Sequence, residues 1–464
     1  MAMDAQEIDV LVVGAGPAGL TAAATLGHYG IGARVVERKH RLSSHPRATV
    51  VSTRSMELLR SWGLENEMRA GGAPDVEWRA RVSETLAGTD GGEVVALGLP
   101  TKDQAAVISP TAPLCAPQSH TESVLLHHAR SLGAEVEFGA EVVRLDVSDQ
   151  GVEALVRTGE TTRVVNARYV IGADGARSVV RSALAIGMDG PGVADAVSVS
   201  AAFTAPVWDI VGEPRYGLYP IVHPEVSSVF VPSGQGDEWL FGVGADLMAR
   251  PDEAEMTRLI GIAAGVPDLE PRIQRITTFS FAAEIADRFA ESSGFLIGDA
   301  AHRVSPRGGT GMNTAIADGF DLGWKLGWAL RGWAGEDLLD TYETERRPVA
   351  AHNVARSADE RGSYRDVVDE IHVDLGGRIA HLWVETGDGW VSTLDLVGDG
   401  LTLFTGPGGT VEIPVTADGG APVSVQELPA VTARALGIAP GGSLLARPSG
   451  VPARTAAAVA LAAA

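Results

Sequence analysis

Residues 8–19 read IDVLVVGAGPAG, and this stretch decides the fold that the sequence predicts. The β-branched run at 8–13 predicts a short buried strand, which the glycines then interrupt. The segment 20–29 is rich in Ala and Leu and predicts a helix, and a second strand-like run follows at 33–37. A strand, a helix and another strand in this order form a β-α-β unit, which predicts a parallel sheet.

Each glycine of this loop has a physical reason to be there. Gly14 permits a tight turn, Gly16 lets the backbone approach a pyrophosphate, and Gly19 allows close packing of helix against strand. The helix would face the phosphates with its free N–H groups and the positive end of its dipole. Glu37 stands 23 residues after Gly14, a spacing that suits a carboxylate bonding a ribose hydroxyl. These residues predict a dinucleotide site but do not choose between NAD and FAD.

The composition places the chain among ordinary globular proteins. It has 464 residues, of which 45% are hydrophobic and 21% charged, with a net charge of −22. Because nucleic acids and anionic membranes attract basic surfaces, this charge argues against both as partners. Cys115 is the one cysteine of the chain, so an internal disulfide and a redox Cys pair are excluded. We expect a cytoplasmic protein without a signal peptide, a membrane span or a metal site, either monomeric or a homodimer.

Two further glycine turns follow strand-like runs later in the chain. Residues 172–178 read GADGARS, and Asp174-Gly175 taken alone is an ordinary turn. Residues 298–302 read GDAAH and 306–313 read PRGGTGMN, just before a predicted helix at 315–331. A carboxylate such as Asp299 can accept hydrogen bonds from a polyol, and a helix N-terminus stabilises developing negative charge. The plainer alternative is a glycine-rich loop without a ligand.

The remaining segments predict a change in the type of secondary structure along the chain. Strand-like runs at 136–143, 151–157 and 163–171 belong to the first region, and a polar helix is expected at 343–364. Short strand-like runs rich in aromatic residues, between 197 and 245, predict an antiparallel sheet inserted into it.

Together, the three turns resemble the FAD-dependent aromatic hydroxylases, which are single-component flavoprotein monooxygenases of the para-hydroxybenzoate hydroxylase type. The polyketide- and phenol-hydroxylase branch is the most similar, and the resemblance runs from about residue 8 to 347. It implies an α/β fold with a Rossmann-like FAD-binding domain, an inserted, mainly antiparallel β-sheet substrate domain and a small thioredoxin-like C-terminal domain. The expected bounds are 1–75, 105–182 and 286–365 for the FAD-binding domain, 76–104 and 183–285 for the substrate-binding domain, and 370–464 for the C-terminal domain, which has no Cys pair.

The resemblance also implies roles for particular residues. The expected FAD-binding residues are Gly14, Gly16, Pro17, Ala18, Gly19, Glu37, Arg38, Arg47, Gln118, Asp174, Gly175, Asp299, Pro306, Gly309, Gly311, Met312 and Asn313. The candidates for the substrate pocket are Arg307, Tyr216, Tyr219, His223, Trp239 and Phe241. Arg307 stands where relatives often carry a small or apolar residue. No residue is singled out as a catalytic acid or base.

The implied activity is hydroxylation of a phenolic or polyketide-type aromatic substrate with NAD(P)H and O2, through a flavin C4a-hydroperoxide. Two alternatives remain open. One is a Baeyer–Villiger or epoxidising oxygenase of the same fold. The other is a non-oxygenating flavoprotein that binds a reactive intermediate.

Overall fold

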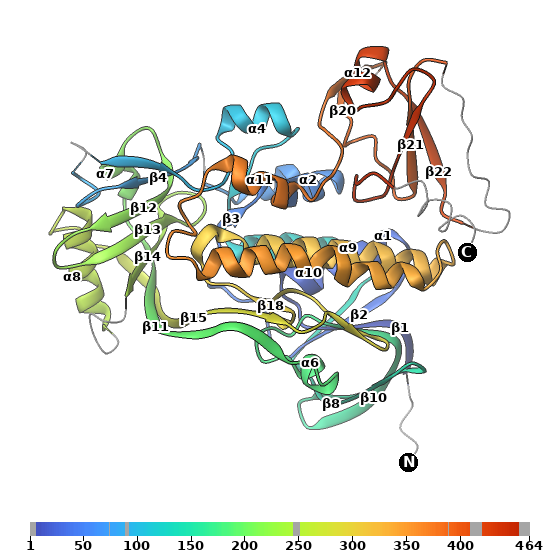
Figure 1. The fold of residues 1–464 in the computed structure, drawn as a ribbon. Coiled ribbons are helices and arrows are strands. Elements are labelled where there is room, and N and C mark those ends of the chain that lie inside the picture. The colour runs from blue at the N-terminus through green and yellow to red at the C-terminus, as the bar shows by residue number, and fades with distance from the viewer. Residues whose placement is uncertain are drawn as a thin grey trace.

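The computed structural model describes residues 6–73, 75–88, 92–244, 251–387, 389–408 and 420–453 of the chain. Two large sheets and a smaller C-terminal region make up the molecule (Figure 1). Among the helices of the described part, none is both long enough and apolar enough to cross a membrane.

The first sheet has the parallel core that the β-α-β unit predicts. Its strand order is β16-β17-β10-β1-β2-β7, and β9 pairs with both β10 and β8. The neighbours β10 and β2 both run parallel to β1, which places the three turns at one edge. The strands are β1 (Gln6–Val13), β2 (Ala33–Glu37), β7 (Glu135–Phe138), β8 (Ala140–Ser148), β9 (Gly151–Thr158), β10 (Thr161–Gly172), β16 (Ala290–Glu291) and β17 (Gly294–Leu296).

Helices α1, α9 and α10 form a layer against this sheet, with α9 and α10 side by side across the centre of the molecule (Figure 1). A stripe of glycines on α9, at positions 319, 323 and 327, meets α1 so closely that a Cβ on any of them would overlap α1 or Tyr29. The helices of the first region are α1 (Pro17–His28), α2 (Thr53–Ser61), α3 (Glu65–Ala70), α4 (Lys102–Ile108), α5 (Gln118–Ser131), α6 (Val179–Ala183), α9 (Gly311–Arg331) and α10 (Asp337–Ala358).

The second sheet is mainly antiparallel, in the order β18-β15-β11-β14-β13-β12-β4-β5. Its two longest strands, β11 and β15, pair with each other and run from beside α6 and β18 toward β14 (Figure 1). Helices α7 (Val207–Val211) and α8 (Glu253–Ala264) contribute to the core on one of its faces. The strands are β4 (Glu77–Val82), β5 (Glu93–Ala96), β11 (Met188–Thr204), β12 (Tyr216–Val222), β13 (Ser227–Pro232), β14 (Glu238–Gly244), β15 (Arg272–Ala286) and β18 (His302–Arg303). A short ladder of β3 (Val50–Val51) and β6 (Leu114–Cys115) lies apart from both sheets.

The C-terminal region has a small core of its own, which includes Val384, Phe404 and Leu428. Its sheet has β21 at the centre, parallel to β22 and antiparallel to β23. The elements are α11 (Val367–Leu375), β19 (Trp383–Thr386), β20 (Gly389–Ser392), β21 (Leu401–Thr405), β22 (Val423–Glu427), α12 (Ala430–Ala435) and β23 (Ser443–Ala446).

Two predictions of local structure were wrong in their bounds. The run at 136–143 is two strands, because Gly139 has a positive φ of 73° and redirects the chain between β7 and β8. The helix expected at 343–364 begins earlier and ends at Ala358. There Asp359 is extended, and the chain turns back so tightly that a Cβ on Gly362 would overlap the carbonyl of Arg356.

Candidate active site

One cavity of about 1380 Å³ is lined by residues of all three glycine turns and by the second sheet. Ligand pockets usually measure about 300–1000 Å³, so this cavity exceeds what one small ligand needs. It has room for a dinucleotide together with a second, flat molecule. The three turns therefore meet around one space, although Gly14 and Asp299 are 285 positions apart in sequence.

Direct contacts hold the three turns together. The backbone N–H of Ala173 donates to the carbonyl of Val13 at 2.8 Å. Arg181 donates from Nη2 to the carbonyl of Ala176 and from Nη1 to the carbonyl of Ala300, both at 3.0 Å. These bonds tie the second turn to the first and to the third, so one backbone bond and the Arg181 side chain preorganise the cavity wall.

The first turn fits a phosphate. Gly14 has a φ of 109°, and a Cβ there would overlap Ala173, so the turn requires glycine. Gly16, by contrast, faces open space, because no atom of the described part of the chain lies within 4 Å of the position of a Cβ. It begins α1 without any side-chain cap, which leaves helix N–H groups free for an anion. Glu37 accepts hydrogen bonds from the N–H groups of Ala15 at 3.0 Å and Lys39 at 2.9 Å, and so shapes the turn itself.

Basic side chains gather beside this turn. The cavity is lined by Arg38, Lys39, Arg41, Arg47 and Arg177. Among the described residues none of the five has an ion-pair partner, although the chain as a whole is strongly acidic. Cationic side chains that are free of ion pairs suit a pyrophosphate.

A carboxyl group on α5 faces the same part of the cavity. Gln118 donates from Nε2 to Oε1 of Glu122 at 2.7 Å. Burial raises the pKa of Glu122 above its ordinary value, although the Gln118 bond and Arg47 act against this. Glu122 lines the cavity but was not a predicted site residue, because an isolated acid within a helix carries no motif.

The second turn serves structure as well as the cavity. Asp174 accepts hydrogen bonds at Oδ2 from the N–H groups of Val179 at 2.6 Å and Val180 at 3.3 Å, and so caps α6. Its other oxygen, Oδ1, is buried and has no hydrogen-bond partner among the described residues. Burial raises the pKa of Asp174. A buried acceptor without a donor fits a ligand that carries a hydroxyl group.

The third turn rests on a buried charge network. Gly298 donates its N–H to Oδ2 of Asp318 at 3.1 Å, next to the cavity-lining Asp299. Asp318 is fully buried and also pairs with Nε2 of His302 at 2.6 Å and Nε of Arg346 at 2.8 Å. Burial opposes its charge, but His302 and Arg346 outweigh this and lower the pKa of Asp318. The network fixes the strand end that presents Asp299.

Of the predicted FAD-binding residues, all but two line this cavity. Gly19 does not line it, because it packs against the carbonyl of Gly14, where a Cβ would overlap. Asn313 does not line it either, because its side chain is turned to the backbone of Val50 and Gly309. Both stay adjacent to the cavity and support its wall.

The prediction for the substrate pocket was mostly wrong. Among the six described candidates only Arg307 lines the cavity. The side chains Tyr219, Trp239 and Phe241 are buried in the core of the second sheet, with Tyr216 packed against it, and His223 follows the end of β12. Successive residues of a strand face opposite sides. Tyr219, Trp239 and Phe241 occupy the side that α7 and α8 cover. Smaller residues of the same strands or of β13 line the cavity: Leu218, Pro220, Val229, Val231, Leu240 and Gly242.

Two residues that the sequence did not indicate as site residues join the loop after β2 to the second sheet. Nε2 of His45 lies 3.2 Å from Oγ1 of Thr277 on β15, and both residues line the cavity. Burial lowers the pKa of His45, and the nearby Arg275 and Arg47 lower it further. No signal for Thr277 or Arg275 was available, because the sequence did not predict β15.

Comparisons with known proteins agree with this geometry. A family model described as "FAD binding domain" matches residues 7–357. The chain is 33% identical to aklavinone 12-hydroxylase RdmE of Streptomyces purpurascens, over 97% of this chain and 95% of that protein. It is 30% identical to 4-methyl-5-nitrocatechol 5-monooxygenase of a Burkholderia species, over 96% and 93%.

A solved structure of aklavinone-11 hydroxylase with FAD and aklavinone superposes with a TM-score of 0.86 at 31% identity, covering 97% of this chain and 96% of that one. Fold, cavity and relatives together define a flavoprotein monooxygenase of the aromatic hydroxylase type, whose cofactor is FAD. The chain belongs to the FAD-binding domain family of these enzymes.

Proposed function

We propose that this enzyme hydroxylates a flat, polycyclic phenol of polyketide type, using NAD(P)H and O2, with FAD and substrate side by side in the single cavity. The observation that carries the proposal is the continuity of that cavity, about 1380 Å³, from the three glycine turns to the second sheet. Homologues that act on aklavinone and on phenols support this substrate class.

The two parts of the cavity suit different ligands. The first turn and its basic neighbours would hold the ADP half of FAD, Asp299 would accept hydrogen bonds from the ribityl chain, and residues 306–312 would lie along the ring. What bound FAD supplies is the transfer of electrons from NAD(P)H to O2 and of an oxygen atom to the substrate. The chain itself binds, orients and keeps out water. The Leu97 and Leu99 side chains, with those of the sheet, close the cavity with apolar surface.

Arg307 is the proposed contact for the acidic oxygen of the substrate. Its guanidinium carbon lies 5.8 Å from the ring centroid of Phe281, and both residues line the cavity. No described residue forms an ion pair with Arg307. The polar groups that line the cavity from the described part of the second sheet are hydroxyl groups and the Arg275 guanidinium. None of them is a carboxylate. A cation in such surroundings stabilises a phenolate, and an ionised phenol is activated for oxygenation without a protein base.

Three further assignments belong to the same proposal. The proposed FAD-binding domain comprises residues 1–75, 105–182 and 286–365. The proposed substrate-binding domain comprises 76–104 and 183–285, and the proposed C-terminal domain comprises 370–464. The mixed sheet around β21, with α12, supports a thioredoxin-like C-terminal domain. A cytoplasmic monomer or homodimer is the proposed working form.

The test is a steady-state assay of purified protein reconstituted with FAD. The oxidation of NADH and NADPH is followed in the presence of 2-naphthol, catechol or 1,8-dihydroxyanthraquinone. The molecular masses of the products are determined by mass spectrometry, and their carbonyl groups are identified by infrared spectroscopy. Faster oxidation with a hydroxylated product supports the proposal. A lactone product indicates the Baeyer–Villiger alternative, and an epoxide the epoxidising one. Ligand binding with no increase in NAD(P)H consumption indicates the non-oxygenating alternative.

A further inference from the structure

Helix α11 lies outside the residues that the family model matches, yet it faces the back of the cavity wall. Glu370 and Asp374 stand four residues apart and therefore on one face of this helix. Each is bonded to a segment that supports residues 305–313, here called the ring loop, in which Gly308, Gly309 and Gly311 line the cavity.

Asp374 holds the start of α2. Its Oδ1 accepts a hydrogen bond from Oγ of Ser52 at 2.6 Å, and its Oδ2 accepts one from the N–H of Arg54 at 3.2 Å. Burial raises the pKa of Asp374. Because Ser52 is the N-cap of α2, Asp374 fixes both the cap and the first turn of that helix.

Ser52 in turn holds the ring loop. Its N–H donates to Oδ1 of Asn313 at 2.8 Å. The amide Nδ2 of Asn313 donates to the carbonyls of Gly309 at 3.0 Å and Val50 at 3.1 Å. Gly309 and Val50 both line the cavity. A chain of hydrogen bonds through the Asp374 side chain, the Oγ and backbone N–H of Ser52, and the Asn313 amide thus runs from α11 to the cavity wall.

Glu370 supports the same loop by a second route. Its Oε2 accepts hydrogen bonds from Nη1 of Arg356 at 3.0 Å and from Nε2 of His352 at 2.9 Å. Arg356 also donates to the carbonyl of Leu97, a cavity residue, at 3.1 Å. It packs so closely under Gly308 that a Cβ there would lie 2.6 Å from its Nε.

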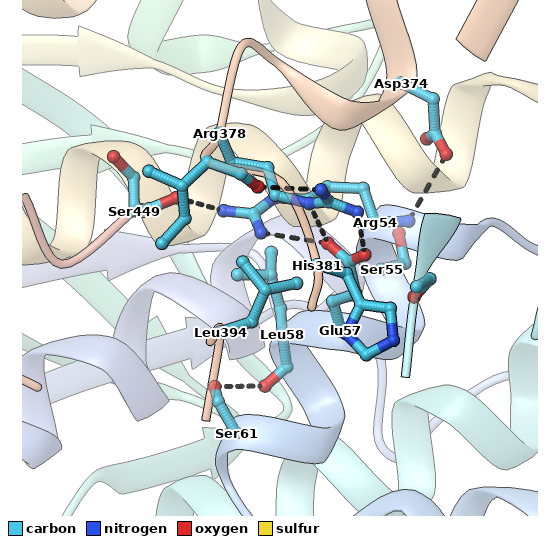
Figure 2. Close-up of polar contacts among 12 residues, drawn as sticks. Arg54, Ser55, Glu57, Leu58, Ser61, Asp374, Arg378, His381, Leu394 and Ser449 are labelled. Atoms are coloured by element: carbon cyan, nitrogen blue, oxygen red, sulfur yellow. Dashed lines mark hydrogen bonds and ion pairs between the residues drawn. The ribbon is translucent and has the colours of Figure 1, made fainter. Parts of the chain in front are cut away.

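Helix α11 is itself fixed by buried ion pairs. Figure 2 shows Arg378, which follows α11, and Arg54 both directed at Glu57 of α2. Arg54 also donates to the carbonyl of Ser449 at 2.6 Å, which ties the C-terminal region to the same point.

We propose that α11 is a positioning element for the FAD ring, with Asp374 acting through Ser52 and Asn313, and Glu370 through Arg356, on the ring loop. A loop so rich in glycine is mobile unless its surroundings fix it, and a cofactor site needs a supported wall to hold its ligand in one geometry. The inference rests on the proposed placement of FAD.

The experiment compares Asp374→Asn with Asp369→Asn, which makes the same change at an exposed position of the same helix. FAD is titrated into apoprotein and its fluorescence quenching is followed. Asn cannot accept from both Ser52 Oγ and the N–H of Arg54. We therefore expect the Kd for FAD to rise about tenfold in Asp374→Asn and less than twofold in the control. At saturating FAD the visible spectrum of the flavin should also shift in Asp374→Asn.

A double-mutant cycle tests the route. The pair Asp374→Asn and Ser52→Ala should together raise the Kd no more than either alone, because both interrupt one chain. Glu370→Gln provides a second variant if Asp374→Asn does not fold, with the same expected rise and spectral shift. An unchanged Kd and spectrum in the variants, with wild type binding FAD, overturns this inference alone. Failure of wild type to bind FAD overturns the proposed function as well.

Discussion

The buried ion pairs between α2 and the segment after α11 make a sharp prediction about Glu57→Gln. Glu57 accepts from Arg378 at 3.0 Å and 2.6 Å and from Arg54 at 3.1 Å, and the side chains of Glu57 and Arg378 are each 3% exposed. The substitution leaves two enclosed guanidinium groups without an anion. Removing one partner of a buried pair costs about 3–5 kcal/mol. At about 1.4 kcal/mol per tenfold, the C-terminal segment should open at least a hundredfold more often.

Hydrogen exchange measures this opening directly. The amide of Ile379, which donates to the carbonyl of Gly450 at 2.9 Å, should exchange at least about a hundredfold faster in Glu57→Gln. The matched control is Glu385→Gln, at an exposed position of β19 where no ion pair is formed. It should leave the rate of Ile379 within about twofold of wild type. A change of less than about threefold in Glu57→Gln would refute the view that this network holds the segment in place.

Four other substitutions test the site and its surroundings. Gly16→Ala should leave the melting temperature of the apoprotein nearly unchanged and raise the Kd for FAD at least about tenfold, because its Cβ meets only ligand space. Gly14→Ala should lower that melting temperature, since its Cβ overlaps Ala173, and equal melting temperatures would contradict this reasoning. Arg307→Met should raise the Kd of a phenolic substrate, read from flavin absorbance, about 10- to 100-fold by removing one charged hydrogen bond, while FAD affinity stays as in wild type. Burial lowers the pKa of His128 to about 4, whereas an unfolded His titrates near 6.5. The unfolded chain thus binds the proton first, so the free energy of unfolding should fall by about 1–2 kcal/mol from pH 6.5 to pH 4. Urea titrations across this range should show a weaker fall in His128→Gln.

What could be predicted from the sequence was local. The strand, turn and helix around Gly14, and the turns at Asp174 and Asp299, depend on neighbours within a few residues, and the structure brings all three to one cavity. Arg307 was noticed through the resemblance, because relatives often carry a small or apolar residue at this position.

What could not be predicted depends on distant partners. One case is which face of the second sheet lines the cavity. Successive side chains of β14 point to opposite faces, and only the packing of α7 and α8 decides which face is covered. Trp239 and Phe241 were therefore assigned to the wrong side. The link from Asp374 to Ser52 is another, because it joins residues 322 positions apart and neither belongs to a motif.

One face of the second sheet packs against α7 and α8 and the other lines the cavity, and this separation has a consequence for evolution. Tyr219, Trp239 and Phe241, which stabilise this sheet on the side of α7 and α8, do not line the cavity, while residues on its cavity side, such as Ser200 and Gly242, are small. A methyl group added at Gly242 would meet only Val229, at 3.2 Å. New substrates can thus be acquired by exchanging side chains on the inner surface, one at a time, without endangering the scaffold behind them.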